Sequence, residues 1–296
     1  MNVILKRYFA YTHSGARTMI KIIADTTSCL PVSIQTEFDI PLVPQLIHFG
    51  EDSFTEGVDI DTDTFLSLLK SSAVLPKTSA PPPELFRAIY QDYYPSENSL
   101  ICIHPSTDLS GTVRSAETAR LDFPDLDIRV IDTRLVASPL GTVVHQAAKM
   151  SKAGGSADAV CQLVSNLSKR CKIYFLVATL EYLARGGRIG GASALLGNVL
   201  QIKPILTLVD GRVEQHTKER TFKRSLEHLK SLVLEEYPTD AEGYMSIMHA
   251  GTPELAQDLS SFFGENLEIE RPPISYLPPA IITHAGPGSI AVGFFR

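Results

Sequence analysis

Apolar and polar residues alternate along the first half of the chain in blocks that predict strands and helices in turn. Short apolar runs with the length of buried strands are each followed by a segment whose apolar residues are spaced three and four apart. The expected strands are residues 20–25, 40–49 (broken by Pro44), 99–106 and 128–136, and the expected helices are 84–94, 110–123, 141–150 and 157–171. This alternation favours a mostly parallel sheet with helices on its faces.

The pattern changes after Lys172, where strands begin to follow one another more closely. Residues 172–180 are apolar almost throughout, and 204–219 are typical of a hairpin with Asp210-Gly211 at its turn. The remaining expected elements are a helix at 225–237, a strand at 243–251, a helix at 253–263 and two apolar pieces within 280–295, the first of them a strand at 280–286. This half is expected to be an α+β domain with antiparallel pairing.

The two patterns together predict a two-domain α/β protein. We expect an N-terminal tail at 1–19, an α/β domain at 20–170 and an α+β domain with a mixed or antiparallel sheet at 171–296. The first nineteen residues are basic, but Lys6 and Arg7 interrupt their apolar run, so a signal peptide is not indicated.

Composition narrows the possible partners. With 44% hydrophobic and 20% charged residues and a formal net charge of −6, the chain has an ordinary globular composition. No cluster of Lys and Arg indicates nucleic-acid binding, and no apolar run has the length of a membrane helix, so stable membrane insertion is not expected. The four cysteines have no CxxC spacing, which favours buried reduced thiols over disulfides or zinc and points to the cytoplasm.

Small polar residues gather where the predicted parallel strands end. These segments are "DTTS" at 25–28, "HPSTDLSGT" at 104–112 and "DTR" at 132–134. Ligands of open parallel sheets bind beyond the carboxyl ends of the strands, and helix N-termini there attract anions. The sequence therefore predicts an anion-binding crevice, although a helix cap is the ordinary role for a single residue such as Ser110.

Catalytic motifs are missing around these hydroxyls. A nucleophilic serine needs a base within hydrogen-bond reach and often a GxSxG elbow, whereas Ser110 stands in "DLSGT". The chain contains no HExxH metal motif and no P-loop, and "GGRIGG" does not fit a dinucleotide fingerprint. We therefore expect no catalytic residue, no metal and no cofactor.

Seven motifs follow one another along the chain, namely "DTTSCLP", "KTSAPPPELF", "IHPSTDLSGTVRSAE", "IDTRLVASPLG", "LEYLARGGRIGG", "QIKPILTLVDGRVE" and "HAGPGSIAVGFF". In this order, over about Lys21 to Phe295, they resemble the DegV family of bacterial fatty-acid-binding proteins. The resemblance implies two α/β domains with a long-chain fatty acid such as palmitate buried between them. Some members are the acyl-binding subunits of fatty acid kinase, whose kinase subunit resembles dihydroxyacetone kinase.

The resemblance also implies roles for particular residues. Those expected at the fatty-acid carboxylate are Thr78 of the "TS" motif, Ser110, Gly111 and Thr112 of "SGT", with His284 and Arg220 as further candidates for the same network. Arg188, and after it Arg185, are expected at the surface, where they would dock the kinase subunit. The family usually continues "TS" as "TSQPS", whereas this chain has Ala80 and Pro82 in place of the Gln and the Ser.

Three functions remain open on the sequence. The first is a fatty-acid-binding protein that presents the carboxyl group to a kinase. The second is an acyl hydrolase that uses Ser110. The third is a lipid-responsive regulatory protein with no kinase partner.

Overall fold

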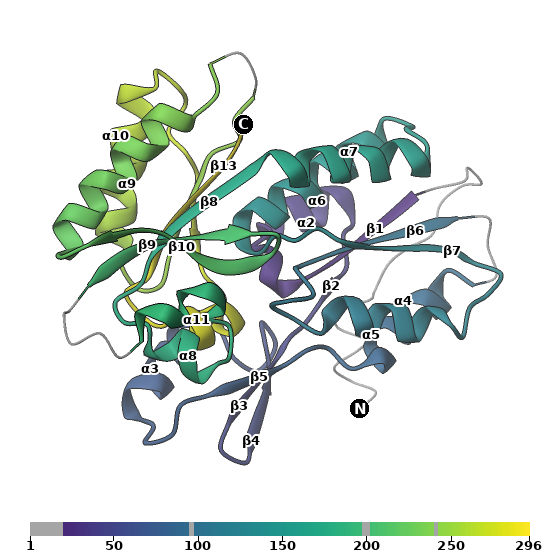
Figure 1. Cartoon of the computed structure of the whole chain (residues 1–296). Helices are drawn as coiled ribbons and strands as arrows, with labels where there is room; N and C mark the ends of the chain where they lie inside the picture. Colours follow the sequence, from purple (N-terminus) through teal and green to yellow (C-terminus); the bar gives the residue numbers. More distant parts are fainter. Residues whose placement is uncertain (1–19, 95–97, 197–201, 240–241) are drawn as a thin grey trace.

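The computed structural model describes residues 20–94, 98–196, 202–239 and 242–296 of the chain (Figure 1). The first sheet has the strand order β2-β1-β6-β7, and all its pairings are parallel. Its strands are β1 (Ile20–Asp25), β2 (Leu42–Val43), β6 (Ser99–His104) and β7 (Asp127–Asp132). The parallel sheet predicted from the alternating pattern is therefore confirmed.

Helices cover both faces of this sheet, which explains why its strands are apolar on both sides. Successive residues of a strand point to opposite faces, so Ile22 and Ile23 of β1 enter different core clusters. On one side lie α2 (Val32–Phe38), α6 (Ala137–Lys152) and α7 (Ala157–Arg170), and on the other α4 (Pro83–Asp92) and α5 (Thr112–Arg120).

The second sheet has six strands in the order β10-β9-β8-β13-β11-β12. They are β8 (Cys171–Leu176), β9 (Lys203–Val209), β10 (Arg212–Glu219), β11 (Ser246–His249), β12 (Ile274–Tyr276) and β13 (Ile290–Phe295). Only the β11–β12 pairing is parallel. One face packs on α9 (Phe222–Glu236) and α10 (Pro253–Asn266). The opposite face, with Ile173, Met248 and Ala291, turns toward the first half of the chain.

A third sheet was not expected from the sequence. It has the order β4-β3-β5, with β3 (Leu46–Phe49), β4 (Asp52–Thr55) and β5 (Lys77–Ser79), and is accompanied by α3 (Thr62–Ser71). Ile47 and Phe65 share a core cluster with Ile282 and Met248. Although this segment lies early in the chain, it therefore packs against the half that holds the second sheet.

The prediction of a strand at 280–286 was wrong, because this segment forms α11 (Pro279–Ala285). Pro278 and Pro279 occupy the N-cap and the first turn, where proline's fixed φ suits a helix start. Gly286, with φ 82°, ends the helix. Figure 1 shows α11 beside α8 (Glu181–Arg185), at the edge of the second sheet nearest β5.

The four cysteines are free, as expected, but only Cys102 is fully buried, while the other three are partly exposed. Within the described residues, no helix combines the length and apolar character needed to cross a membrane.

Candidate ligand-binding site

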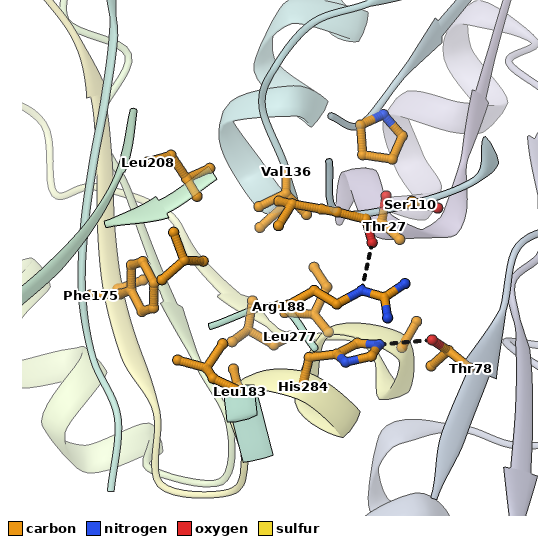
Figure 2. Close-up of a pocket in the computed structure, with 18 of the residues that line it drawn as sticks. Thr27, Thr78, Ser110, Val136, Phe175, Leu183, Arg188, Leu208, Leu277 and His284 are labelled. Carbon is orange, nitrogen blue, oxygen red and sulfur yellow. Dashed lines mark hydrogen bonds between the residues drawn. The ribbon is translucent and has the colours of Figure 1, made fainter. Parts of the chain in front are cut away.

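A cavity of about 990 Å³, counting its open mouth, lies between the first and second sheets (Figure 2). Most of its walls are apolar. The apolar lining includes Val136, Ile173, Phe175, Leu208, Val213, Met248, Leu277, Ile281 and Ala291. Ile173 and Phe175 alternate along β8 with Tyr174 and Leu176, which pack on the opposite face. The strand predicted at 172–180 thus contributes one of its faces to the cavity.

Polar side chains are gathered at one end of this cavity. They are Thr27, Gln45, Thr78, Ser110, Arg188 and His284, while a further polar lining residue, Ser289, uses its hydroxyl to bond the Ala285 and Gly286 carbonyls. They come from segments far apart in the sequence, because the carboxyl ends of β1 and β6, strand β5, helix α11 and the turn after α8 meet here. Ala80 also lines this end, and it stands where the resemblance would place a glutamine.

Ser110 and Gly111 lie between β6 and α5 and line the cavity, whereas Thr112 is the first residue of α5 and does not line it. The Ser110 hydroxyl bonds the Thr112 hydroxyl at 2.7 Å and accepts a bond from the Thr112 amide at 3.3 Å. Thr112 is fully buried and also bonds Gln45 at 3.0 Å. Thr112 therefore supports the Ser110 hydroxyl from behind.

A buried network anchors this end of the cavity. It joins Asp25 and His104, from segments that the sequence placed at the crevice, to Gln45, which sequence reasoning missed. The Gln45 amide donates to Asp25 Oδ1 at 3.2 Å, and Asp25 Oδ2 lies 2.9 Å from His104 Nδ1. Asp25 also accepts the Thr27 amide at 3.0 Å, which fixes the short turn after β1. The sequence signals were the polar residues that follow "IKIIA" and the Gln that follows the strand break at Pro44.

His284 projects from α11 into the polar end and shares a 2.8 Å hydrogen bond between its Nε2 and the Thr78 hydroxyl. Burial first, and then the positive charge of Arg188, lower the pKa of His284 to about 4, so the ring is neutral at neutral pH. Its Nδ1 is buried and has no hydrogen-bond partner among the residues that the structure describes. A Cβ at Gly186 would lie 2.2 Å from that nitrogen, so glycine is required beside it.

Arg188 lies in the cavity wall, whereas the sequence predicted it at the surface. Its Nε donates to the Leu109 carbonyl at 3.0 Å and its Nη1 to the Gly186 carbonyl at 2.7 Å. Figure 2 shows its guanidinium between Ser110 and His284. Burial lowers the pKa of this guanidinium below its ordinary value.

The turn after α8 explains the different positions of the two arginines. Gly187 has φ +69°, and the Arg188 amide donates back to the Leu183 carbonyl at 2.9 Å, so the chain reverses there. Arg188 is thereby directed into the cavity. Arg185 stays on the exposed side of α8, where it pairs with Glu181 at 2.8 Å.

Two expected contributors lie elsewhere. Arg220 is exposed in the bend between β10 and α9 and is not among the residues that line the cavity. It is therefore left out of the candidate site. The "DTR" segment also stays outside the lining, and its Asp132 and Arg134 bond the neighbouring loop instead. In the described parts of the chain, no three His, Cys, Asp or Glu side chains are grouped to hold a metal ion.

The fold and the site define an α/β protein whose two main sheets enclose an apolar cavity with one polar end. The family model for DegV, described as an uncharacterised protein family, matches residues 19–296. The chain therefore belongs to the DegV family. A DegV domain-containing protein of Clostridium acetobutylicum is 32% identical over 280 residues, covering 93% of this chain and 97% of the relative.

Solved structures of the family have the same fold. A Thermus thermophilus DegV family protein described by its fatty acid binding superposes with a TM-score of 0.87 at 30% identity, covering 94% of this chain and 99% of that one. DegV of Bacillus subtilis, described as a fatty acid binding protein, superposes with a TM-score of 0.86 at 26% identity, covering 95% and 100%.

Proposed function

We propose that this protein binds a long-chain fatty acid, with the alkyl chain in the apolar cavity and the carboxylate at its polar end. The observation that carries the proposal is the segregation of the cavity lining. Ser110, Thr78, Arg188 and His284 meet at one end, and the remaining walls are largely aliphatic or aromatic. The relatives described as fatty acid binding proteins support the same ligand class.

The two ends of the cavity would make different contributions to binding. Each buried methylene contributes about 0.8 kcal/mol, so a chain of about fourteen gives roughly 11 kcal/mol before association costs offset part of it. Charge-assisted hydrogen bonds from hydroxyls and from the Arg188 guanidinium would orient the carboxylate. In this proposal the cation at the carboxylate is Arg188, whereas the candidate cation named from the sequence was Arg220.

The geometry around Ser110 favours binding over acyl hydrolysis. Its hydroxyl bonds Thr112, and among the described residues no histidine lies within hydrogen-bond distance of it. His284 bonds Thr78, and His104 reaches Ser110 only through Asp25, Gln45 and Thr112. A serine nucleophile needs an adjacent base, and neither histidine is placed to serve as one.

Ser110→Ala and Thr78→Ala are each expected to weaken palmitate binding about tenfold or more, because one bond to a charged group contributes roughly 1.5–3 kcal/mol. Isothermal titration with delipidated protein measures the change, and circular dichroism checks the fold. Native mass spectrometry of protein purified from cells should show a bound acyl chain. Unchanged affinity in both variants would refute the head-group assignment. Ester hydrolysis that disappears in Ser110→Ala would establish the hydrolase instead.

We further propose that the bound carboxylate is presented to a kinase subunit for acyl phosphate formation. This step follows from the family resemblance and from the exposed Arg185, which stands on α8 next to the turn that carries Arg188. A lipid-responsive protein without a kinase would bind the same ligand, so the partner has to be tested separately.

Arg188→Ala and Arg185→Ala should distinguish residues that bind the lipid from residues that bind the kinase subunit. Arg188→Ala is expected to weaken palmitate binding about tenfold or more, because it removes the cation at the polar end. Arg185→Ala is expected to bind palmitate normally but to lower acyl phosphate formation when ATP and a cognate kinase subunit are added. If Arg188→Ala binds palmitate normally, Arg188 does not bind the carboxylate, and only the docking role remains for it.

A further inference from the structure

The tip of the β9–β10 hairpin contacts the loop that carries Ser110. The turn of this hairpin is Asp210-Gly211, and both residues have positive φ, 47° and 77°. The Gly211 carbonyl accepts a 2.8 Å hydrogen bond from the hydroxyl of Ser106, which is fully buried. A Cβ at Gly211 would lie 2.2 Å from that hydroxyl, so the approach requires glycine.

Asp108 forms the charged part of the same contact. It lies between two arginines, accepting from Arg212 Nε at 2.9 Å and from Arg134 Nη1. Arg212 begins β10, whereas Arg134 follows β7 in the first half of the chain. Arg134 Nη1 also reaches the Asp210 carbonyl at 3.3 Å. Bonds therefore cross between the two halves of the chain in both directions.

This contact is connected directly to the candidate site. The Ser106 carbonyl accepts the amides of Leu109 at 3.0 Å and Ser110 at 2.9 Å, and Leu109 and Ser110 both line the cavity. The hairpin itself supplies Leu208 and Val213 to the apolar wall. Ser106 therefore makes both contacts: its hydroxyl bonds the hairpin tip, and its carbonyl bonds the turn that carries Ser110.

We infer that Ser106, Asp108, Arg134, Gly211 and Arg212, here called the hairpin latch, position the Ser110 turn and hold the two halves closed over a bound fatty acid. Ser106 and Asp108 are positioning residues, because they act through Ser110 and do not line the cavity themselves. Breaking the latch should let the hairpin and the turn separate, and the ligand should then leave faster. The inference takes the identity of the ligand from the proposed function, but the contacts of the hairpin latch do not depend on that identity.

Release of a fluorescent polyene fatty acid into excess lipid vesicles, followed by stopped flow, measures the effect. Arg212→Ala and Asp108→Asn should each release the probe about fivefold faster or more, and Arg212→Lys should recover part of the loss. Salt screens partly exposed charges, so release from the wild type should become faster as KCl rises from about 50 to about 500 mM. The two variants should show a smaller acceleration. Arg120→Ala, which removes an exposed ion pair to Glu117 on α5, is the matched control.

Hydrogen exchange in the absence of ligand separates failure of the latch from failure of the proposed function. The Leu109 and Ser110 amides should exchange faster in Asp108→Asn than in the wild type, whether or not the protein binds a fatty acid. If these amides exchange faster in Asp108→Asn but the protein binds no fatty acid, the role of the latch is supported and the proposed ligand is refuted. Wild-type exchange and wild-type release in both latch variants would refute the latch.

Discussion

Ala291→Phe is expected to weaken palmitate binding by roughly a hundredfold or more. Ala291 lies on β13 opposite Phe175 of β8, and both side chains line the cavity. A phenyl ring there would fill space that the alkyl chain needs. Displacing about four methylenes would remove about 3 kcal/mol at 0.8 kcal/mol each. Octanoate, which is shorter, should lose much less affinity than palmitate.

Titration of both acids against delipidated protein provides the measurement. Ala291→Leu should give an intermediate loss, which tests whether volume is the cause. Val74→Phe introduces the same ring at an exposed position away from the cavity lining and should bind normally. Equal losses for octanoate and palmitate would mean that the ring disturbs the polar end or the fold, and that the alkyl chain lies elsewhere.

Most strands of the two main sheets were predictable, because burial on two faces leaves a continuous apolar run, as in "IKIIA" and "SLICI". Strand β12 (Ile274–Tyr276) was missed, because it is three residues long and largely exposed. The hairpin turn was predictable for a local reason as well, since Asp210 and Gly211 tolerate positive φ. The helix at 279–285 was missed because a short apolar segment such as "AIITHA" suits a strand or a helix equally. Pro278 and Pro279, at the start of this helix, were the better signal.

The polar end of the site was only partly predictable. Ser110 and Thr78 were identified from motifs, and the structure brings both to the cavity. The direction of Arg188 depends on the positive φ of Gly187 and on the backbone bond to Leu183, which residue types alone do not reveal. Gln45 was missed because its partners, Asp25 and Thr112, are 20 and 67 residues away in sequence.

Glu56 is a buried carboxylate that joins the two sides of the cavity behind its lining. Its Oε1 accepts the Ala280 amide at 2.6 Å, at the start of α11, and its Oε2 accepts the Thr26 hydroxyl. The N-cap of α11 is Pro278, which provides no side-chain cap. Glu56 therefore satisfies a donor at the first turn of the helix that carries His284.

The cost of burying this charge makes the stability of the protein depend on pH. Burial, opposed by the bonds from Thr26 and Ala280 and increased by the nearby charge of Asp25, raises the pKa of Glu56 from 4.5 to about 7. Between pH 4.5 and about 7, Glu56 is ionised in the unfolded chain but still protonated in the folded chain. The contribution of Glu56 to the free energy of unfolding is therefore fully present below pH 4.5 and is lost as the pH rises to about 7.

Glu56→Gln is expected to remove this loss, because a neutral amide accepts from Ala280 without a buried charge. The free energy of unfolding of the wild type, minus that of Glu56→Gln, should fall by about 3 kcal/mol between pH 4.5 and 8, at 1.36 kcal/mol for each pH unit of the pKa change. Chemical denaturation across this range measures the difference, in which the other titrating groups cancel. Glu51→Gln, at an exposed position, controls for the loss of a carboxylate as such. A difference that stays constant with pH would show that Glu56 is ionised throughout, and that the bonds from Thr26 and Ala280 outweigh its burial.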